Sequence, residues 1–248
     1  MDEAEKLVSM AARAAGKFFY AEDWLFAPAL VRARSIIEEG AIGEVLYCSG
    51  KETHNGSHSP FAQTLEYCGG GALIHLGVHP VGLFQPMFGL PHTVAGRCTG
   101  GLDGNMVHHK LEGEDWAIGI LSFEGGRQAV VEGNYITTGG MDDVVEFYGT
   151  DGVLKLDLTF GSPLSVYSRK GYGYAVEKAD FTHGWTRPAV DEYYSLGYRD
   201  ELKHFVDCVR DGREQAAGTT AADGLEVLRT IRTVYEANQS GKMIHPKR

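Results

Sequence analysis

Three consecutive glycines followed by an apolar segment with two histidines constrain this chain more than any other feature. Residues 69–79 have the sequence GGGALIHLGVH. Consecutive glycines allow backbone conformations closed to other residues, and the apolar run predicts a buried helix entered from a tight turn. On a helix, His75 and His79 share one face because they lie four residues apart. These two imidazoles could be metal ligands, proton-transfer groups or hydrogen-bonded core residues.

The length and charge of the chain exclude several classes of partner. With 248 residues, 43% of them hydrophobic, a sizeable core is expected. A formal charge of −10, from 33 acidic and 23 basic side chains, disfavours nucleic acid or an anionic membrane surface as partner. The acidic start of the chain and the lack of a membrane-length apolar window favour a cytoplasmic location. Four widely spaced cysteines without CxxC spacing indicate reduced thiols.

Apolar periodicity predicts both helices and strands. Helices with apolar residues on one side are expected over residues 2–15, 28–39 and 198–210 and from a capped start at 219–223 to Gly241. Short strands are expected over residues 18–21 and 44–49. After Pro91 the composition changes to short apolar stretches separated by turn residues, which predict strands over residues 93–98, 116–123, 128–135, 143–148, 153–157 and 164–167.

These elements indicate an α+β fold, in which a large open, mostly antiparallel sheet has helices packed on one face. A polar loop over residues 51–60 leads from the second expected strand to the glycine turn. Glu52, His54 and His58 in this loop are candidate substrate-binding residues, because loops held by a scaffold often carry function. A solvated loop of turn residues explains each of them equally well.

Several motifs occur in the order found in one family. Residues 69–79 resemble the GGG-x-x-x-D-x-G-x-H segment of the glucose-fructose oxidoreductase, inositol dehydrogenase and MocA family. The resemblance extends over nearly the whole chain, through the segments YAEDWLFAP at 20–28, GAIGEV at 40–45, GGMDD at 139–143, YGTDG at 148–152 and GYRDELKHF at 197–205. It implies an oxidoreductase that acts on a sugar, cyclitol or related polyol.

The resemblance also implies roles for individual residues. His79 matches the usual proton-transfer histidine of the family, and His75 stands where the family usually has a substrate-binding aspartate. Trp185 and Tyr198 fall in segments that line the substrate pocket in the family. Residues 1–25 contain no G-x-G-x-x-G, the turn that holds a dinucleotide pyrophosphate. We therefore expect residues 1–22 to be the remnant helix and strand of a nucleotide-binding domain, and residues 23–248 to be an α+β substrate and oligomerisation domain.

Three functions stay open at this point. In the first, the chain is the substrate-binding part of an NAD(P)-dependent polyol oxidoreductase with His79 as the base, incomplete for hydride transfer by itself and without a tightly bound nucleotide. In the second, it is a stand-alone lyase, epimerase or hydrolase that holds zinc or another divalent metal on His75 and His79, completed by His54, His58 or Glu52. In the third, it is a non-catalytic carbohydrate-binding or oligomerisation module, whose sheet would pack against that of another subunit in a homo-oligomer.

Overall fold

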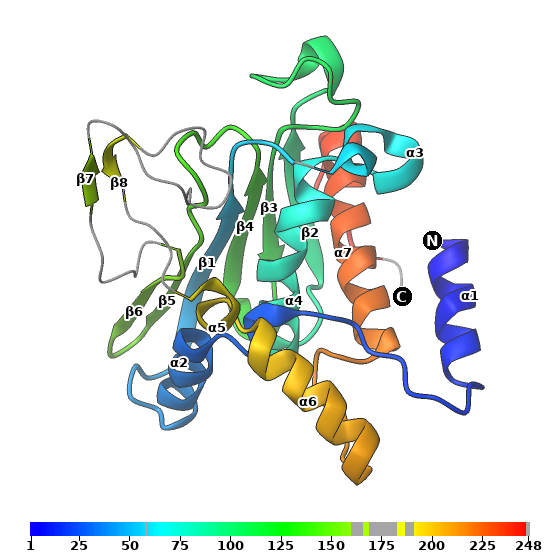
Figure 1. Ribbon diagram of the computed structural model, residues 1–248, viewed down its shortest axis with the longest axis vertical. Coiled ribbons are helices and arrows are strands. Elements are labelled where there is room, and N and C mark those ends of the chain that lie inside the picture. Colours follow the sequence, from blue (N-terminus) through cyan, green and yellow to red (C-terminus); the bar gives the residue numbers. More distant parts are fainter. Residues whose placement is uncertain (58, 160–165, 169–182, 187–190, 247–248) are drawn as a thin grey trace.

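The computed structural model describes residues 1–57, 59–159, 166–168, 183–186 and 191–246. A six-stranded sheet with the order β2-β3-β4-β1-β5-β6 organises them (Figure 1). Its strands are β1 Val45–Thr53, β2 Thr93–Cys98, β3 Trp116–Ser122, β4 Gln128–Asn134, β5 Val144–Gly149 and β6 Val153–Asp157. Two short strands, β7 Val166–Ser168 and β8 Gly184–Thr186, form a separate antiparallel pair.

The sheet is antiparallel except at its centre. The pairs β2–β3, β3–β4, β1–β5 and β5–β6 are antiparallel, whereas β1 runs parallel to β4, with Cys48 opposite Ala129. A parallel pair needs a long crossover connection. Residues between β1 and β4 supply it, and they include the glycine turn, the two histidines and β3.

The helices lie against the sheet and along its rim. They are α1 Asp2–Ala11, α2 Pro28–Glu38, α3 Leu65–Cys68, α4 Val78–Phe88, α5 Glu192–Ser195, α6 Tyr198–Asp211 and α7 Ala221–Ser240. A π-helical turn, η3 Leu73–Gly77, leads directly into α4, and short 3₁₀ turns are η1 Asp23–Leu25, η2 Pro60–Gln63, η4 Leu102–Gly104 and η5 Glu124–Gly126. Helix α7 packs on β2 and α4 on β1 and β4, while α1 lies beside α7 (Figure 1).

One continuous core lies between the sheet and these helices. Strand β3 alternates between the two sides, so Ala117 and Leu121 are fully buried while Ile120 is 46% exposed. The largest fully buried side chains of the core include Trp24, Leu30, Phe84, Phe123, Phe147 and Ile231. Since a buried side chain of this size contributes about 1.5–3 kcal/mol, this layer fixes α4 and α7 on the sheet.

Most of the expected elements are confirmed, although α1 ends at Ala11 and the strand expected over residues 164–167 lies partly outside the described residues. The strands over 93–98 and 153–157 have the expected bounds, and the last helix begins with the capping box of Thr220 and Asp223. The strand expected over residues 18–21 is wrong, because this segment is not paired with a strand. Tyr20 instead donates its backbone N–H to the carbonyl of Thr219, at 2.8 Å, and Phe19 stacks on Phe205.

The three glycines meet different requirements. Only Gly69, with φ of 73°, uses the left-handed region. Gly71 is needed for close approach, because a Cβ atom there would lie 1.9 Å from the carbonyl oxygen of Glu114. The Glu114 carboxylate accepts from the N–H groups of Gly71 and Leu73, both at 2.9 Å, and so caps the start of the helix. The turn therefore fixes the position of the following helix.

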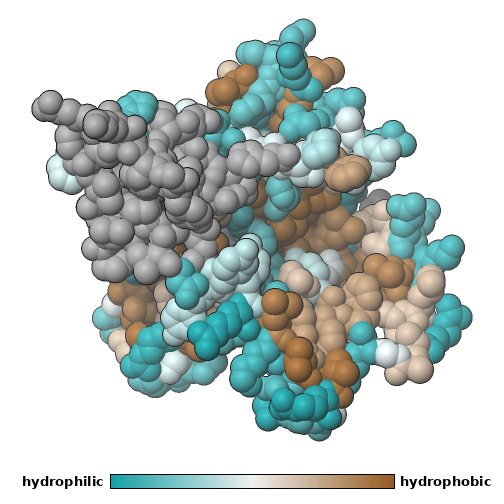
Figure 2. All heavy atoms as spheres, viewed as in Figure 1, coloured by the Kyte–Doolittle hydropathy of each residue, from teal (hydrophilic) through white to brown (hydrophobic). Residues whose placement is uncertain are grey.

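Among the described residues, no helix has the length and apolar character needed to cross a membrane. Apolar side chains do gather on one outer surface, over α6, in the lower part of Figure 2. There Leu202, Val206 and Val209 are 58–66% exposed.

Candidate functional site

His79 lies among three carboxylates. Its Nδ1 atom is 2.9 Å from Oε1 of Glu22 and 3.1 Å from Oδ1 of Asp23, and its Nε2 atom is 3.4 Å from Oε2 of Glu52. The carboxylate side chains are 0%, 5% and 9% exposed, whereas that of His79 is 21% exposed. The histidine is thus the member of the group that reaches solvent.

Three separate segments bring this group together. Glu22 and Asp23 lie at the start of η1, Glu52 near the end of β1, and His79 in the first turn of α4. The indole of Trp24 stacks on the imidazole, with ring centroids 5.8 Å apart. Tyr20 donates its hydroxyl hydrogen to Oε2 of Glu22 at 3.2 Å. The ring of His79 is therefore held both by charge and by packing.

The carboxylates determine the protonation of His79. Burial lowers its pKa, but the nearby charges of Glu52, Glu22 and Asp23 outweigh burial and raise the pKa well above its ordinary value. Burial raises the pKa of Glu22 and, more strongly, that of Glu52, against the lowering effect of the imidazole. Because ionised carboxylates only accept hydrogen bonds, Nδ1 carries a proton that it donates toward Glu22 and Asp23.

Two further buried acids, Asp143 and Glu201, lie near this group. Burial raises the pKa of Asp143 to about 7 and that of Glu201 to about 7. Within the part of the chain that the structure describes, Oδ2 of Asp143, Oε1 of Glu201 and Oε2 of Glu52 have no hydrogen-bond partner. Buried acceptor atoms usually have a partner, so these oxygens indicate a ligand or a proton in this region.

His75 and His54 belong to a second cluster. Nδ1 of His75 is 2.5 Å from the hydroxyl of Tyr135, and the ring of His54 lies against both, with centroids 6.0 Å from His75 and 5.3 Å from Tyr135. His54 is fully buried at the end of β1. Glu52 lies close to both clusters. Its charge raises the pKa of His79, and it also raises the pKa of Tyr135, although burial and the charges of Cys68 and Glu114 have larger effects there.

The remaining candidates from the sequence differ in their placement. Tyr198, 40% exposed, lies near the His79 group: burial raises its pKa, and the charges of Asp23 and His79 also affect it. Trp185 on β8 is 77% exposed. His58 lies outside the described residues.

Glu22, Asp23, Asp143, Glu201 and Tyr135 were not among the residues selected from the sequence. Glu22 and Asp23 do carry a signal, because two acids stand inside the aromatic and apolar run YAEDWLF. A charged pair in such a run is buried only when it has partners. Those partners lie far along the chain and were not recognisable by spacing.

Glu22, Asp23 and His79 are also the group of side chains that could hold a metal ion in the described parts of the chain. One ligand atom from each lies within 4.8 Å of the others. His75 is not in this group, so the metal pair of His75 and His79 expected from the sequence stays a prediction without a shared site in the described residues.

The N-terminal residues do not fit a dinucleotide. Asp2, Glu3 and Glu5 occupy the first turn of α1, where their carboxylates would repel a pyrophosphate at the helix start. Residues 1–25 also lack the glycine-rich turn that such a ligand needs.

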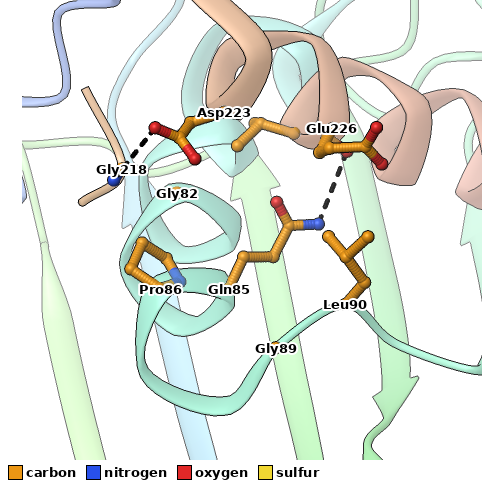
Figure 3. Close-up of a pocket in the computed structure, with 9 residues that line it drawn as sticks. Gly82, Gln85, Pro86, Gly89, Leu90, Gly218, Asp223 and Glu226 are labelled. Carbon is orange, nitrogen blue, oxygen red and sulfur yellow. Dashed lines mark hydrogen bonds between the residues drawn. The ribbon is translucent and has the colours of Figure 1, made fainter. Parts of the chain in front are cut away.

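A separate pocket of about 130 Å³ lies between α4 and α7 (Figure 3). Its polar side chains already serve the fold: Gln85 donates to Oγ1 of Thr230 at 2.6 Å and to the carbonyl of Glu226 at 3.4 Å, and Asp223 belongs to the capping box. We assign no ligand to it.

The structure is an α+β domain with a helix-backed open sheet and a histidine flanked by carboxylates near the end of β1. The chain belongs to the oxidoreductase family, C-terminal alpha/beta domain, whose family model matches residues 34–245. This confirms the resemblance to the glucose-fructose oxidoreductase, inositol dehydrogenase and MocA family.

Relatives of known activity support the same family. Over 76% of its length the chain is 25% identical to scyllo-inositol 2-dehydrogenase (NAD(+)) of Bacillus subtilis, and over 85% it is 23% identical to D-apiose dehydrogenase of Rhizobium rhizogenes. It covers 51% and 59% of those proteins, so it spans little more than half of their length.

Solved structures share the fold. The structure of GenD2 from gentamicin A biosynthesis, in complex with NAD, has a TM-score of 0.89 at 24% identity, with 100% of this chain and 68% of that chain covered. A scyllo-inositol dehydrogenase from Lactobacillus casei has a TM-score of 0.73 at 18% identity, covering 98% of this chain and 69% of that chain.

Proposed function

We propose that this chain is the substrate-binding domain of an NAD(P)-dependent oxidoreductase that acts on a sugar, a cyclitol or a related polyol. His79 would be the group that takes the hydroxyl proton. The observation that carries the proposal is the arrangement of His79, with Nδ1 directed at Glu22 and Asp23 and Nε2 toward Glu52. The dehydrogenases of inositol and apiose among the relatives support a polyol as substrate.

The arrangement suits proton transfer. The Nδ1 proton donated to Glu22 and Asp23 fixes the orientation of the ring. In the neutral form of His79, which its raised pKa shifts to higher pH, Nε2 is the acceptor for a substrate proton. When Nε2 takes that proton, the three carboxylates stabilise the imidazolium that forms. Oε2 of Glu52 is buried, lies 3.4 Å from Nε2 and has no hydrogen-bond partner among the described residues, so we propose that it binds a hydroxyl beside the one that reacts. His75, His54, His58, Trp185 and Tyr198 are proposed as further substrate contacts.

A nicotinamide cofactor would accept the hydride, and residues 1–25 contain no glycine-rich turn to bind it. We propose that residues 1–22 are the remnant of a nucleotide-binding domain, that residues 23–248 form the substrate domain, and that the chain alone does not complete the reaction. The acidic first turn of α1 supports this division.

Calorimetric titration tests this proposal. We expect inositols or aldoses to bind, His79→Gln to weaken this binding at least about tenfold, or about 1.4 kcal/mol, and His109→Gln, a change at an exposed histidine, to leave it unaltered. NAD+ should give no measurable heat. Micromolar affinity for NAD+ would contradict the incomplete nucleotide site, and polyol binding that survives His79→Gln would contradict the role of His79.

We also propose that the open face of the sheet joins two copies of the chain. Trp116, Ile118 and Ile120 alternate along this face of β3, and Ile120 is 46% exposed. Apolar residues on the uncovered face of an antiparallel sheet favour such a contact. Light scattering should give the mass of a dimer or larger oligomer, and Ile120→Lys should shift it to a monomer. A monomeric unaltered protein would rule the contact out.

A further inference from the structure

The group around Nδ1 of His79 has the spacing of metal ligands. Oε1 of Glu22 and Oδ1 of Asp23 lie 2.9 Å and 3.1 Å from Nδ1. Around an octahedral ion with bonds of about 2.1 Å, neighbouring ligand atoms are about 3 Å apart. The distances from the nitrogen to the two oxygens therefore match such a sphere, and one ligand atom of each residue lies within 4.8 Å of the others.

The other nitrogen of His79 has the environment typical of a metal-binding histidine. Such a histidine usually donates its second N–H to a carboxylate, which orients the ring. Here Oε2 of Glu52, buried and without a hydrogen-bond partner among the described residues, lies 3.4 Å from Nε2. Glu22 is oriented as well, since Tyr20 donates to its other oxygen at 3.2 Å.

The charge of the group favours a cation. Glu22, Asp23 and Glu52 are each at least 91% buried, and the basic side chain paired with them in the described structure is His79. Glu201 is 4% exposed, and its Oε1 has no hydrogen-bond partner in the described parts of the chain, so it adds a further acid beside Glu22 and Asp23. Buried carboxylates in excess of buried cations are costly unless a proton or a metal ion offsets them.

We propose that Glu22, Asp23 and His79 form a binding site for one divalent cation, with Glu52 as the carboxylate that orients the imidazole. A mixed nitrogen and oxygen set suits Mn²⁺ or Zn²⁺, and the uncovered coordination positions would take water or neighbouring hydroxyls of a polyol. The site shares His79 with the function proposed above, and the two uses of this side chain exclude each other. An ion on Nδ1 displaces the proton there and leaves the Nε2–H bonded to Glu52, so cation-bound His79 accepts no substrate proton.

Titration of the chelator-treated, unmodified chain with Mn²⁺ tests the site, with free Mn²⁺ followed by electron paramagnetic resonance. We expect one equivalent to bind. Asp23→Asn and Glu22→Gln should each weaken binding at least about tenfold, and Glu52→Gln by about 10–100-fold. Glu146→Gln is the matched control, because this carboxylate pairs with Lys155 on β6, and it should bind Mn²⁺ as the unmodified chain does.

A second measurement does not depend on variants that might fold poorly. Pulsed resonance of bound Mn²⁺ should show coupling to one imidazole nitrogen in the unmodified chain. No binding, binding without nitrogen coupling, or equal affinity in Asp23→Asn and Glu146→Gln would each overturn the proposal. Polyol titration in the absence of metal reports on the proposed function alone, so the two proposals can fail separately.

Discussion

Replacing Gly71 by alanine should destabilise the protein by about 3–5 kcal/mol or prevent its folding. An added Cβ atom would stand 1.9 Å from the carbonyl oxygen and 2.5 Å from the backbone nitrogen of Glu114. Gly113 lies against Gly71 from the other segment, since a Cβ atom at Gly113 would lie 2.6 Å from the Cα of Gly71. The clash is between backbone segments, so no side-chain rotation relieves it. Moving the two backbone segments apart would also break the hydrogen bond from the Gly71 N–H to the Glu114 carboxylate, which caps the helix.

Gly69→Ala is the matched control two residues earlier. Its Cβ would meet nothing nearer than Cδ1 of Ile74 at 3.8 Å, so its cost is the left-handed φ of 73° alone, about 1 kcal/mol. Urea unfolding of both variants gives the two losses in the free energy of unfolding. Similar losses would show that conformation, and not close approach, is what the glycine run provides.

Asp115→Asn should cost about 2–3 kcal/mol of stability at neutral pH. The Asp115 carboxylate is fully buried and accepts from the backbone N–H groups of Met106, Val107 and His108 at 2.8–3.1 Å. It also accepts from the hydroxyl of Thr99 at 2.9 Å. An amide would turn its NH₂ group toward N–H donors, so at least one buried donor would lose its acceptor.

The pH dependence of this loss follows from the pKa of Asp115. Burial raises that pKa, but the hydrogen bonds from Val107, His108, Met106 and Thr99 together bring it below its ordinary value. A pKa lower in the folded than in the unfolded chain gives stability that is complete above the unfolded pKa, about 3.9, and is lost as the pH falls through the folded value.

The difference between the unmodified protein and Asp115→Asn should therefore narrow in acid. Urea unfolding from neutral pH down to below the ordinary pKa of an aspartate measures it. Asp103→Asn, at an exposed position of the same loop, should differ little from the unmodified protein throughout. A difference that stays constant with pH would mean that the charge of Asp115 is not what orders the loop.

The elements of the sheet could be predicted because they depend on local patterns. Strands β2 and β6 follow from apolar stretches bounded by turn residues, and the start of α7 follows from Thr220 and Asp223. The segment 18–21 has a strand's composition as well, but in the fold it lies beside the loop that precedes α7. Composition indicates which secondary structure a segment can form. Whether a strand forms also depends on which distant segment lies beside it in the fold.

The site was only partly predictable for the same reason. The family motif selected His79, and the polar loop selected Glu52. Glu22 joins them from 57 residues before His79, and no spacing rule connects two such positions. His75 and His79 are only four residues apart, yet His75 faces Tyr135 while His79 faces the carboxylates. The four-residue spacing predicted that the two histidines share a face of the helix. It could not predict the partners that determine the chemistry of each one.

The parallel pairing of β1 with β4 has a consequence for synthesis of the chain. Strand β1 leaves the ribosome first, but both of its neighbours in the sheet, β4 and β5, are made only after the whole crossover. Cys48 and the carbonyl of Gln128, which touch in the finished sheet, are 80 residues apart. Strand β1 must therefore stay unpaired until β4 has emerged. The glycine turn and α4 are synthesised before either strand that pairs with β1.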